Sequence, residues 1–241
     1  MEKISRAVII ILEPNQRIIC ALDVTDPGEA RRIVGELDGL VDFFKVGMLL
    51  YLVDGRKIVQ WLLEQGKKVF LDLKFYDVPD TVGPAVSRVA ASGVHLLTVH
   101  GNREILKRAG EAAAGTGLQV LAVTALTSLD VTDIREMGFA CSVEELVLQR
   151  AKWAMKYGCA GVIASPREAA LVRARCGKEL LIVTPGIRLV GGDLGTHKRA
   201  ASPGEAVAAG ADYLVVGQPI IKSGDPRAAA RQIAGEIRTG K

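Results

Sequence analysis

Eight apolar, β-branched segments recur along the chain with long amphipathic stretches between them, and this rhythm restricts the possible folds more than any other feature. Near-continuous apolar strands that alternate with helices predict a parallel sheet that is covered on its outer face. Eight such units predict a (β/α)8 TIM barrel. The expected strands are residues 18–24, 43–47, 68–74, 94–100, 118–124, 160–165, 180–186 and 212–217.

The length of 241 residues fits one barrel domain, since α/β barrels of this size commonly form a single unit. We expect the barrel to occupy residues 18–241 and residues 1–17 to form an N-terminal extension packed on it. The extension contains an apolar run at residues 7–12, which is far too short to cross a bilayer. No membrane association is therefore expected.

Charge and cysteine content exclude several classes of protein. The net charge of +4 is mild, and the basic residues are scattered rather than gathered in a stripe, so nucleic-acid binding is not expected. A small anionic ligand accounts for the charge better. The four cysteines show no C-x-x-C spacing and no neighbouring histidines, which argues against a zinc site and against a disulfide framework. A cytoplasmic location is predicted.

Several helix starts carry capping signals. Asp26 stands before Pro27, Ser142 begins a capping box, and the segment 202–205 reads Ser-Pro-Gly-Glu. The longest stretch without a strong helix or strand signal is residues 186–201. Compact domains rarely carry a long glycine-rich loop without a function, so this loop after the seventh strand is expected to take part in one.

Charged side chains stand at the carboxyl ends of the first three predicted strands, where the reacting groups of such barrels lie. These residues are Asp23, Lys45, Asp72 and Lys74. The period of two along a strand puts Asp72 and Lys74 on one face, with Cα atoms about 6.6 Å apart. Asp77 lies beyond the strand, where it can face a neighbouring chain as well as its own site.

Lys45, Asp72, Lys74 and Asp77 would form a chain of alternating positive and negative charge. Lysines and carboxylates of such an array hold one another ionised, because an opposite charge favours ionisation while burial opposes it. A structural salt-bridge network would have the same composition. The position of the cluster at the ends of adjacent strands favours a functional site over that alternative.

The sequence resembles the orotidine 5′-phosphate decarboxylase family from residue 18 to the C-terminal helix. The D-x-K-x-x-D-x-P-x-T string after a strand is highly specific to that family. The resemblance rests on ALDV with Asp23, FFKVG with Lys45, FLDLKFYDVPDTV with Asp72, Lys74, Asp77 and Thr81, VTALTS with Thr127, TPGIR with Arg188, and DYLVVG with Gly217.

The resemblance implies a reaction that needs no cofactor and no metal. The carboxylate of the substrate's orotate ring would lie against Asp72, and Lys74 would protonate C6 after carbon dioxide leaves. Repulsion between two carboxylates disappears as carbon dioxide departs, and an adjacent ammonium stabilises the developing carbanion. The family also implies that Asp23 and Lys45 hold ribose hydroxyls.

The resemblance further implies a homodimer with shared active sites. Asp77 and Thr81 would reach across the interface into the partner's site, and Thr127 would lie near the pyrimidine. His100 ends the fourth predicted strand, but a histidine at such a position is more often packed in the core than catalytic.

The chain departs from the family where the substrate's phosphate would bind. His197 stands where the family has a glutamine, and Gln218 where it has a phosphate-binding arginine, whereas Arg188 and the backbone of Gly217 remain. Loss of a bidentate cation removes a contact worth about 1.5–3 kcal/mol. Phosphate binding is expected to be weaker unless the basic run 197–199 compensates, and that run is equally typical of a solvated loop.

Two other functions remain open. One is a magnesium-dependent sugar-phosphate decarboxylase or synthase of the same superfamily, against which Pro79, Thr81 and Thr127 argue. The other is a non-catalytic nucleotide-binding paralogue, for which the missing arginine argues. A protein that only binds nucleotides has little need of the full charge cluster.

Overall fold

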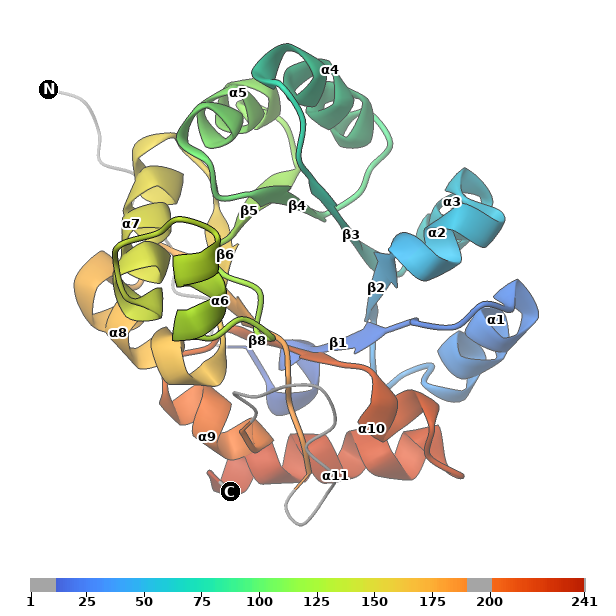
Figure 1. Cartoon of the computed structure of the whole chain (residues 1–241). Coiled ribbons are helices and arrows are strands. Elements are labelled where there is room, and N and C mark those ends of the chain that lie inside the picture. Colours follow the sequence, from blue (N-terminus) through green and yellow to red (C-terminus); the bar gives the residue numbers. More distant parts are fainter. Residues whose placement is uncertain (1–11, 190–200, 241) are drawn as a thin grey trace, which may run out of the picture.

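The computed structural model describes residues 12–189 and 201–240, and in these residues eight parallel strands form one closed sheet (Figure 1). The strands are β1 Ile18–Ala21, β2 Phe43–Gly47, β3 Lys68–Phe75, β4 Leu96–His100, β5 Gln119–Val123, β6 Gly161–Ile163, β7 Leu181–Thr184 and β8 Tyr213–Val216. Each strand pairs with the next in chain order, and β8 pairs with β1. The predicted (β/α)8 barrel and its eight strands are confirmed.

Helices surround the sheet on its outer side (Figure 1). They are the 3-10 helix η1 Pro14–Arg17 and the α-helices α1 Pro27–Glu36, α2 Met48–Asp54, α3 Arg56–Glu64, α4 Pro79–Ala90, α5 Arg103–Ala113, α6 Val131–Glu136, α7 Val143–Lys156, α8 Pro166–Cys176, α9 Pro203–Ala208, α10 Gln218–Ile221 and α11 Pro226–Thr239. The predicted starts are confirmed, because Asp26, Ser142 and Ser202 each accept a hydrogen bond from a backbone N–H of the following first turn.

The inside of the barrel is filled by one cluster of apolar side chains, called here the inward or apolar layer. Side chains alternate along each strand, so every second residue points inward. The inward layer includes Phe43, Phe70 and Leu96, whereas their strand neighbours pack against the helices. Lys45 and Asp72 lie two residues beyond Phe43 and Phe70, and the same alternation therefore puts these charged side chains directly above the apolar layer.

A break in the pairing between β3 and β4 lies beside the charged residues. Leu71 pairs with Leu97, but the next pairing joins Phe75 to Val99, so β3 has additional residues that bulge from the ladder. Within the bulge Lys74 has φ = 49°, the one positive φ found at a non-glycine residue of the described chain. A left-handed conformation at such a residue costs about 1–3 kcal/mol, and such strain concentrates at functional sites.

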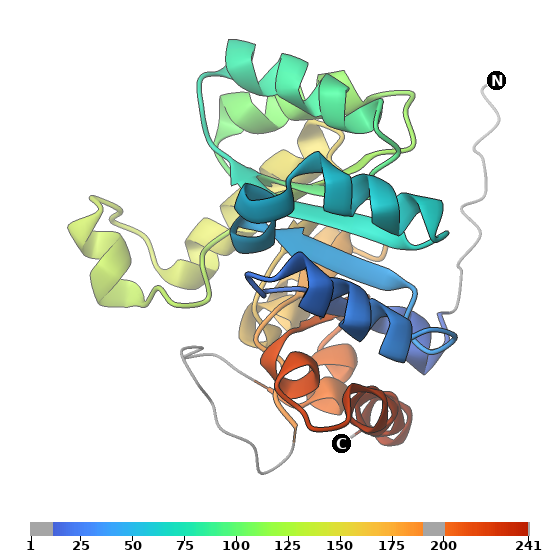
Figure 2. The same ribbon diagram turned by 90° about the vertical axis from the view of Figure 1, so that its right-hand side faces the viewer.

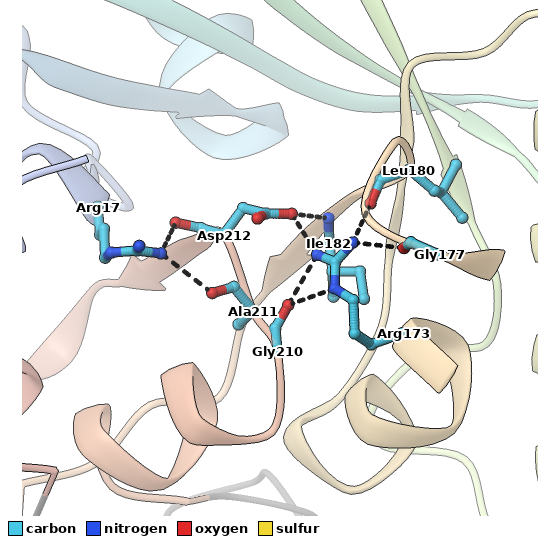
Figure 3. A network of polar contacts seen from close by, with 8 residues as sticks. All are labelled: Arg17, Arg173, Gly177, Leu180, Ile182, Gly210, Ala211 and Asp212. Atoms are coloured by element: carbon cyan, nitrogen blue, oxygen red, sulfur yellow. Dashed lines mark hydrogen bonds and ion pairs between the residues drawn. The ribbon is translucent and has the colours of Figure 1, made fainter. Parts of the chain in front are cut away.

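The amino ends of β7 and β8 are joined by a polar network (Figure 3). Arg173 Nη2 lies 2.7 Å from Asp212 Oδ2, and that oxygen also accepts the backbone N–H of Ile182 at 2.8 Å. Arg17 Nη1 donates to the backbone carbonyl of Asp212 at 3.2 Å. Arg173 donates further hydrogen bonds to the backbone carbonyls of Gly177, Leu180 and Gly210. The network ties α8 and the segment before β1 to the end of the barrel opposite the charge cluster.

The chain ends and long loops are described in part. η1 lies against α11, whereas residues 1–11 of the predicted extension lie outside the described residues, and the boundary at residue 17 stays a prediction. Of the loop 186–201, residues 190–200 also lie outside them. Figure 2 shows α6 projecting from the end of the barrel toward which the strand arrows point. In the part of the chain that the structure describes, no helix has the length and apolar character needed to span a bilayer.

Candidate active site

A cavity of about 480 Å³ opens at the carboxyl ends of the strands, above the apolar layer. Its lower wall includes Phe70, Val123, Ile163 and Val215. Most of the predicted site residues line it, namely Asp23, Lys45, Asp72, Lys74, Thr127, Arg188, Gly217 and Gln218. The fold therefore brings together residues from β2 and β3 and from the segments after β1, β5, β7 and β8, as expected for the reacting end of such a barrel.

A continuous chain of charges from β2, β3 and the segment after β1 lies along one wall of the cavity. Lys45 Nζ lies 2.8 Å from Asp23 Oδ1 and 3.7 Å from Asp72 Oδ2. Asp72 Oδ1 in turn lies 2.9 Å from the Lys74 ammonium. The Lys45 side chain is only 9% exposed and that of Asp72 13%. Lys45 and Asp72 are thus largely removed from water, whereas Asp23 and Lys74 are partly exposed, and each charge has a nearest partner of the opposite sign.

The environment keeps Asp72 ionised. Burial by itself raises the pKa of this carboxyl group, but the nearby ammonium groups of Lys45 and Lys74 and the hydrogen bonds from Lys74 and Thr98 outweigh it, so that the pKa lies below its ordinary value. At neutral pH the site therefore presents a carboxylate with two ammonium groups beside it. A carboxylate held in this state repels an anionic substituent placed against it.

Thr98 is a site residue that the sequence analysis missed. It is fully buried on β4, and its hydroxyl donates to Asp72 Oδ1 at 2.8 Å while accepting the backbone N–H of Lys74 at 3.0 Å. Threonine is common in strands, so the residue type alone did not indicate a functional role. Its position did carry a signal, because Thr98 lies on the inward face of β4, two residues beyond Leu96.

Glycine at the end of β2 leaves room for the close fit around Lys45. A Cβ atom at Gly47 would lie 2.9 Å from Lys45 Nζ and 3.0 Å from Asp23 Oδ1. Any side chain there would push apart the ion pair between Lys45 and Asp23. The glycine of the FFKVG motif is thus explained by the space that the charged pair needs.

The far end of the cavity is basic. Gly217, Gln218 and Arg188 line it, together with Lys222 at the end of α10, which the sequence analysis did not single out. Among the described residues no carboxylate lies within ion-pair distance of Arg188 or Lys222. His197 and the rest of the run 197–199 lie outside the described residues. Two cations that have no acidic partner among the described residues make this end suited to an anion.

Asp77 and Thr81 do not line the cavity of their own chain. Both residues are exposed, and the Asp77 carboxylate accepts the backbone N–H of Val78 at 2.6 Å. Asp77 instead lines a surface groove of about 570 Å³ between α5 and the β3 exit, which is the segment 76–79 that follows β3. A single chain therefore brings together three of the four predicted members of the charge chain.

His100 supports the β3 exit and does not line the cavity. Its ring packs on Tyr76 with centroids 4.5 Å apart. Burial, with the nearby positive charges of Arg150 and Lys74, lowers the pKa of His100. The imidazole is therefore neutral at neutral pH, as expected for a packed histidine.

Comparisons with known proteins agree with this geometry. The sequence model of the "Orotidine 5'-phosphate decarboxylase / HUMPS family" matches residues 16–233. The orotidine 5′-phosphate decarboxylase of Afipia carboxidovorans is 47% identical over 224 residues, which cover 93% of this chain and 95% of that protein. The enzyme of the same name from Methylococcus capsulatus is 46% identical, with 92% of each chain covered.

Solved structures show the same similarity. The crystal structure of orotidine 5′-phosphate decarboxylase from Lactobacillus acidophilus superposes with a TM-score of 0.81 at 35% identity, covering 92% of this chain and 99% of that one. A structure of an uncharacterized conserved protein from Geobacillus kaustophilus superposes with a TM-score of 0.79 at 33% identity, covering 91% and 99%. The similarity thus extends over the whole barrel.

Proposed function

The chain belongs to the orotidine 5′-phosphate decarboxylase / HUMPS family, and we propose that it converts orotidine 5′-phosphate to uridine 5′-phosphate without a metal or an organic cofactor. The observation that carries this proposal is the carboxylate of Asp72 held between the ammonium groups of Lys45 and Lys74 at the wall of the cavity. The curated relatives that bear the name of this activity cover nearly the whole chain.

The reaction needs one bond cleavage and one proton transfer. The bond between C6 of the pyrimidine and its carboxylate breaks, carbon dioxide leaves, and the electron pair stays on C6. The Lys74 ammonium then gives a proton to C6, and solvent restores the lysine. Lys74 is suited to this step because Asp72 holds its ammonium 2.9 Å away at the cavity wall.

Asp72 contributes by the change in its interaction with the substrate. In the reactant its negative charge faces the substrate carboxylate, and this repulsion disappears as neutral carbon dioxide forms. Lys45 and Lys74 meanwhile remain beside the negative charge that develops on C6. Interactions that are more favourable in the transition state than in the bound reactant raise the rate.

The other cavity residues fit the rest of the nucleotide. Asp23 and Lys45 lie between the reacting end and the basic end, where they can hold ribose hydroxyls. We assign the phosphate to the basic end, with Arg188, the Gly217 backbone and Lys222 as its ligands and Gln218 as a neutral donor. Lys222 thereby offsets part of the charge that the family's arginine would supply at residue 218.

A homodimer with shared sites accounts for the position of Asp77. Large apolar side chains are exposed on α2 and at the β3 exit: Met48 60%, Leu49 48%, Leu52 78%, Val53 54%, Tyr76 66% and Val78 62%. Exposed apolar patches of this kind mark interaction sites. A second copy placed on this surface would cover it and would receive Asp77 and Thr81 near its own cavity. The cytoplasmic location likewise stays a prediction.

A magnesium-dependent reaction fits the site less well. The carboxylates of Asp23 and Asp72 are each paired with lysine ammonium groups, which repel a divalent cation. Among the described residues no group of three or more acidic, histidine or cysteine side chains is arranged to hold a metal ion. The non-catalytic paralogue is opposed by the complete arrangement of Lys45, Asp72 and Lys74 around the cavity.

The proposal is tested by the ultraviolet absorbance of orotidine 5′-phosphate mixed with purified, EDTA-treated protein. We expect turnover by the intact protein and a loss of at least about 10³-fold in Lys74→Ala. Lys68→Ala is the matched control, because Lys68 begins the same strand and is exposed at the opposite end of the barrel. Restoration of turnover only by added magnesium would favour the sugar-phosphate enzyme, and an inert intact protein would favour the non-catalytic paralogue.

A further inference from the structure

Thr98 is the one polar side chain that contacts both halves of the Asp72–Lys74 pair in the described chain. Phe70 of β3 pairs with Leu96 of β4, and two residues further along each strand the Thr98 hydroxyl contacts Asp72. Thr98 is fully buried and does not line the cavity. It therefore lies behind the reacting groups and out of contact with anything bound in front of them.

The two hydrogen bonds of the hydroxyl have defined directions. The backbone N–H of Lys74 donates to Thr98 Oγ1 at 3.0 Å, and the hydroxyl proton is thus left for Asp72 Oδ1, 2.8 Å away. Lys74 Nζ donates to the same Oδ1 at 2.9 Å. One carboxylate oxygen of Asp72 consequently has two donors, which prevents free rotation of the carboxylate.

The second oxygen of Asp72 is left for the cavity. No described residue donates a hydrogen bond to Oδ2, whose nearest recorded cation is Lys45 Nζ at 3.7 Å. The contact of Thr98 with the Lys74 backbone has a second effect, because it satisfies the N–H of a residue held at φ = 49° within the β3 bulge. Without that acceptor the bulge loses one of the contacts that hold it in this conformation.

We propose that Thr98 is a positioning residue for decarboxylation: its hydroxyl fixes the orientation of the Asp72 carboxylate and the left-handed backbone of Lys74 at the same time. This inference rests on the proposed function. It differs from the roles of the charged residues, because Thr98 neither touches the substrate nor carries charge. Its loss should slow the chemical step and leave nucleotide binding intact.

The test compares Thr98→Val, which has nearly the same shape without the hydroxyl, with Thr98→Ser, which keeps it. A hydrogen bond to a charged group supports a loss of about 10- to 100-fold in kcat for Thr98→Val. Thr98→Ser should stay within about threefold of the intact protein, since it retains both hydrogen bonds. Binding of uridine 5′-phosphate, measured by calorimetry, should change less than about twofold in either variant.

Thr124→Val is the matched control. Thr124 is also fully buried, but its hydroxyl donates to the backbone carbonyl of Ile163 at 2.6 Å, away from Asp72 and Lys74. This variant measures what loss of a buried, hydrogen-bonded hydroxyl does to the barrel in general. We expect Thr124→Val to lower the melting temperature and to keep kcat near that of the intact protein.

Several outcomes would overturn the inference. An unchanged kcat in Thr98→Val would do so. An equal loss of kcat in Thr98→Ser and Thr98→Val would also do so, as would a loss of uridine 5′-phosphate affinity in Thr98→Val as large as its loss of kcat. If Thr98→Val does not fold, Thr98→Ala replaces it, and equal kcat in Thr98→Ala and Thr98→Ser would contradict the role of the hydroxyl. If the intact protein has no activity, both the proposed function and this inference are contradicted. If the intact protein is active and Thr98→Val is equally active, only the inference is contradicted.

Discussion

Asp72 Oδ1 lies 2.9 Å from the Lys74 ammonium, although the two residues are separated by a single residue and Lys74 is at a left-handed backbone position. In a regular strand their side chains would stand parallel on one face, roughly 6–7 Å apart at Cα. The β3 bulge changes the direction of the second side chain. The proton donor and the carboxylate thus form one unit whose geometry depends on the bulge.

Acid should destabilise the protein partly through Asp72. The pKa of this carboxyl is lower in the folded state than its ordinary value of 3.8, so the unfolded chain takes up the proton first as pH falls. The stability that Asp72 contributes is present above that value and is lost as pH falls through the folded-state pKa. Urea unfolding between about pH 5 and pH 2 should show a shallower decline for Asp72→Asn than for the intact protein. Equal slopes would mean that Asp72 is not held ionised by its neighbours.

Lys222→Met should weaken binding of the nucleotide's phosphate. The loss of one cation from a partly exposed site should raise the Michaelis constant for orotidine 5′-phosphate by about 3- to 10-fold, and binding of uridine, which has no phosphate, should not change. Lys178→Met removes a lysine at the opposite end of the barrel and serves as control. Equal effects of Lys222→Met on uridine and on uridine 5′-phosphate would speak against a phosphate contact.

The complementary change adds a cation at the same end of the cavity. Gln218→Arg should lower the Michaelis constant for orotidine 5′-phosphate, because a guanidinium can hold a phosphate through two hydrogen bonds. An unchanged or higher value would show that the phosphate is held elsewhere.

Shared active sites can be detected by mixing two inactive variants. Lys74→Ala and Asp77→Asn should each be inactive alone, but a heterodimer would contain one site with both original residues. Joint refolding of equal amounts should therefore recover about a quarter of the activity of the intact protein, from a statistical mixture of dimers. Independent sites within each chain would give no recovery. Refolding each variant separately before mixing is the control.

The network in Figure 3 should contribute stability and no catalysis. Arg173→Met leaves Asp212 without its ion-pair partner and several backbone carbonyls without donors, so we expect a loss of about 2–4 kcal/mol in the free energy of unfolding. Arg175→Met, an exposed change on the same helix, should stay within about 0.5 kcal/mol. Denaturant melts measure both values. A large fall in kcat for Arg173→Met at a temperature where it is folded would contradict the separation of the two barrel ends.

The sequence was sufficient to predict the barrel because each strand is an apolar segment with a clear beginning and end. It also located Lys45 and Asp72 near the strand ends, where both line the cavity, since their side chains follow the inward layer at a spacing of two. The bulge at Lys74 could not be predicted, because it arises from the pairing of β3 with β4 and not from the local composition of either.

The remaining differences have similar causes. Thr98 was missed because its importance comes from the strand beside it, and Lys222 because it follows a short helix whose orientation depends on packing. The capping boxes at Ser142 and Ser202 were predictable, since all their contacts are local. Asp77 was expected to face either its own site or a neighbouring chain, and one chain alone places it away from the cavity.

The conformation of Lys74 has a consequence for attempts to make this protein more robust. Glycine adopts a positive φ without steric penalty, so replacing Lys74 with glycine would relax the backbone at this position. A screen that selects only for heat resistance would not protect Lys74, because this relief of backbone strain partly offsets the loss of the ammonium beside the buried Asp72 carboxylate. Screens on this scaffold should retain a selection for turnover, because the residue with the least backbone strain at position 74 is glycine, whereas the residue that can donate the proton is lysine.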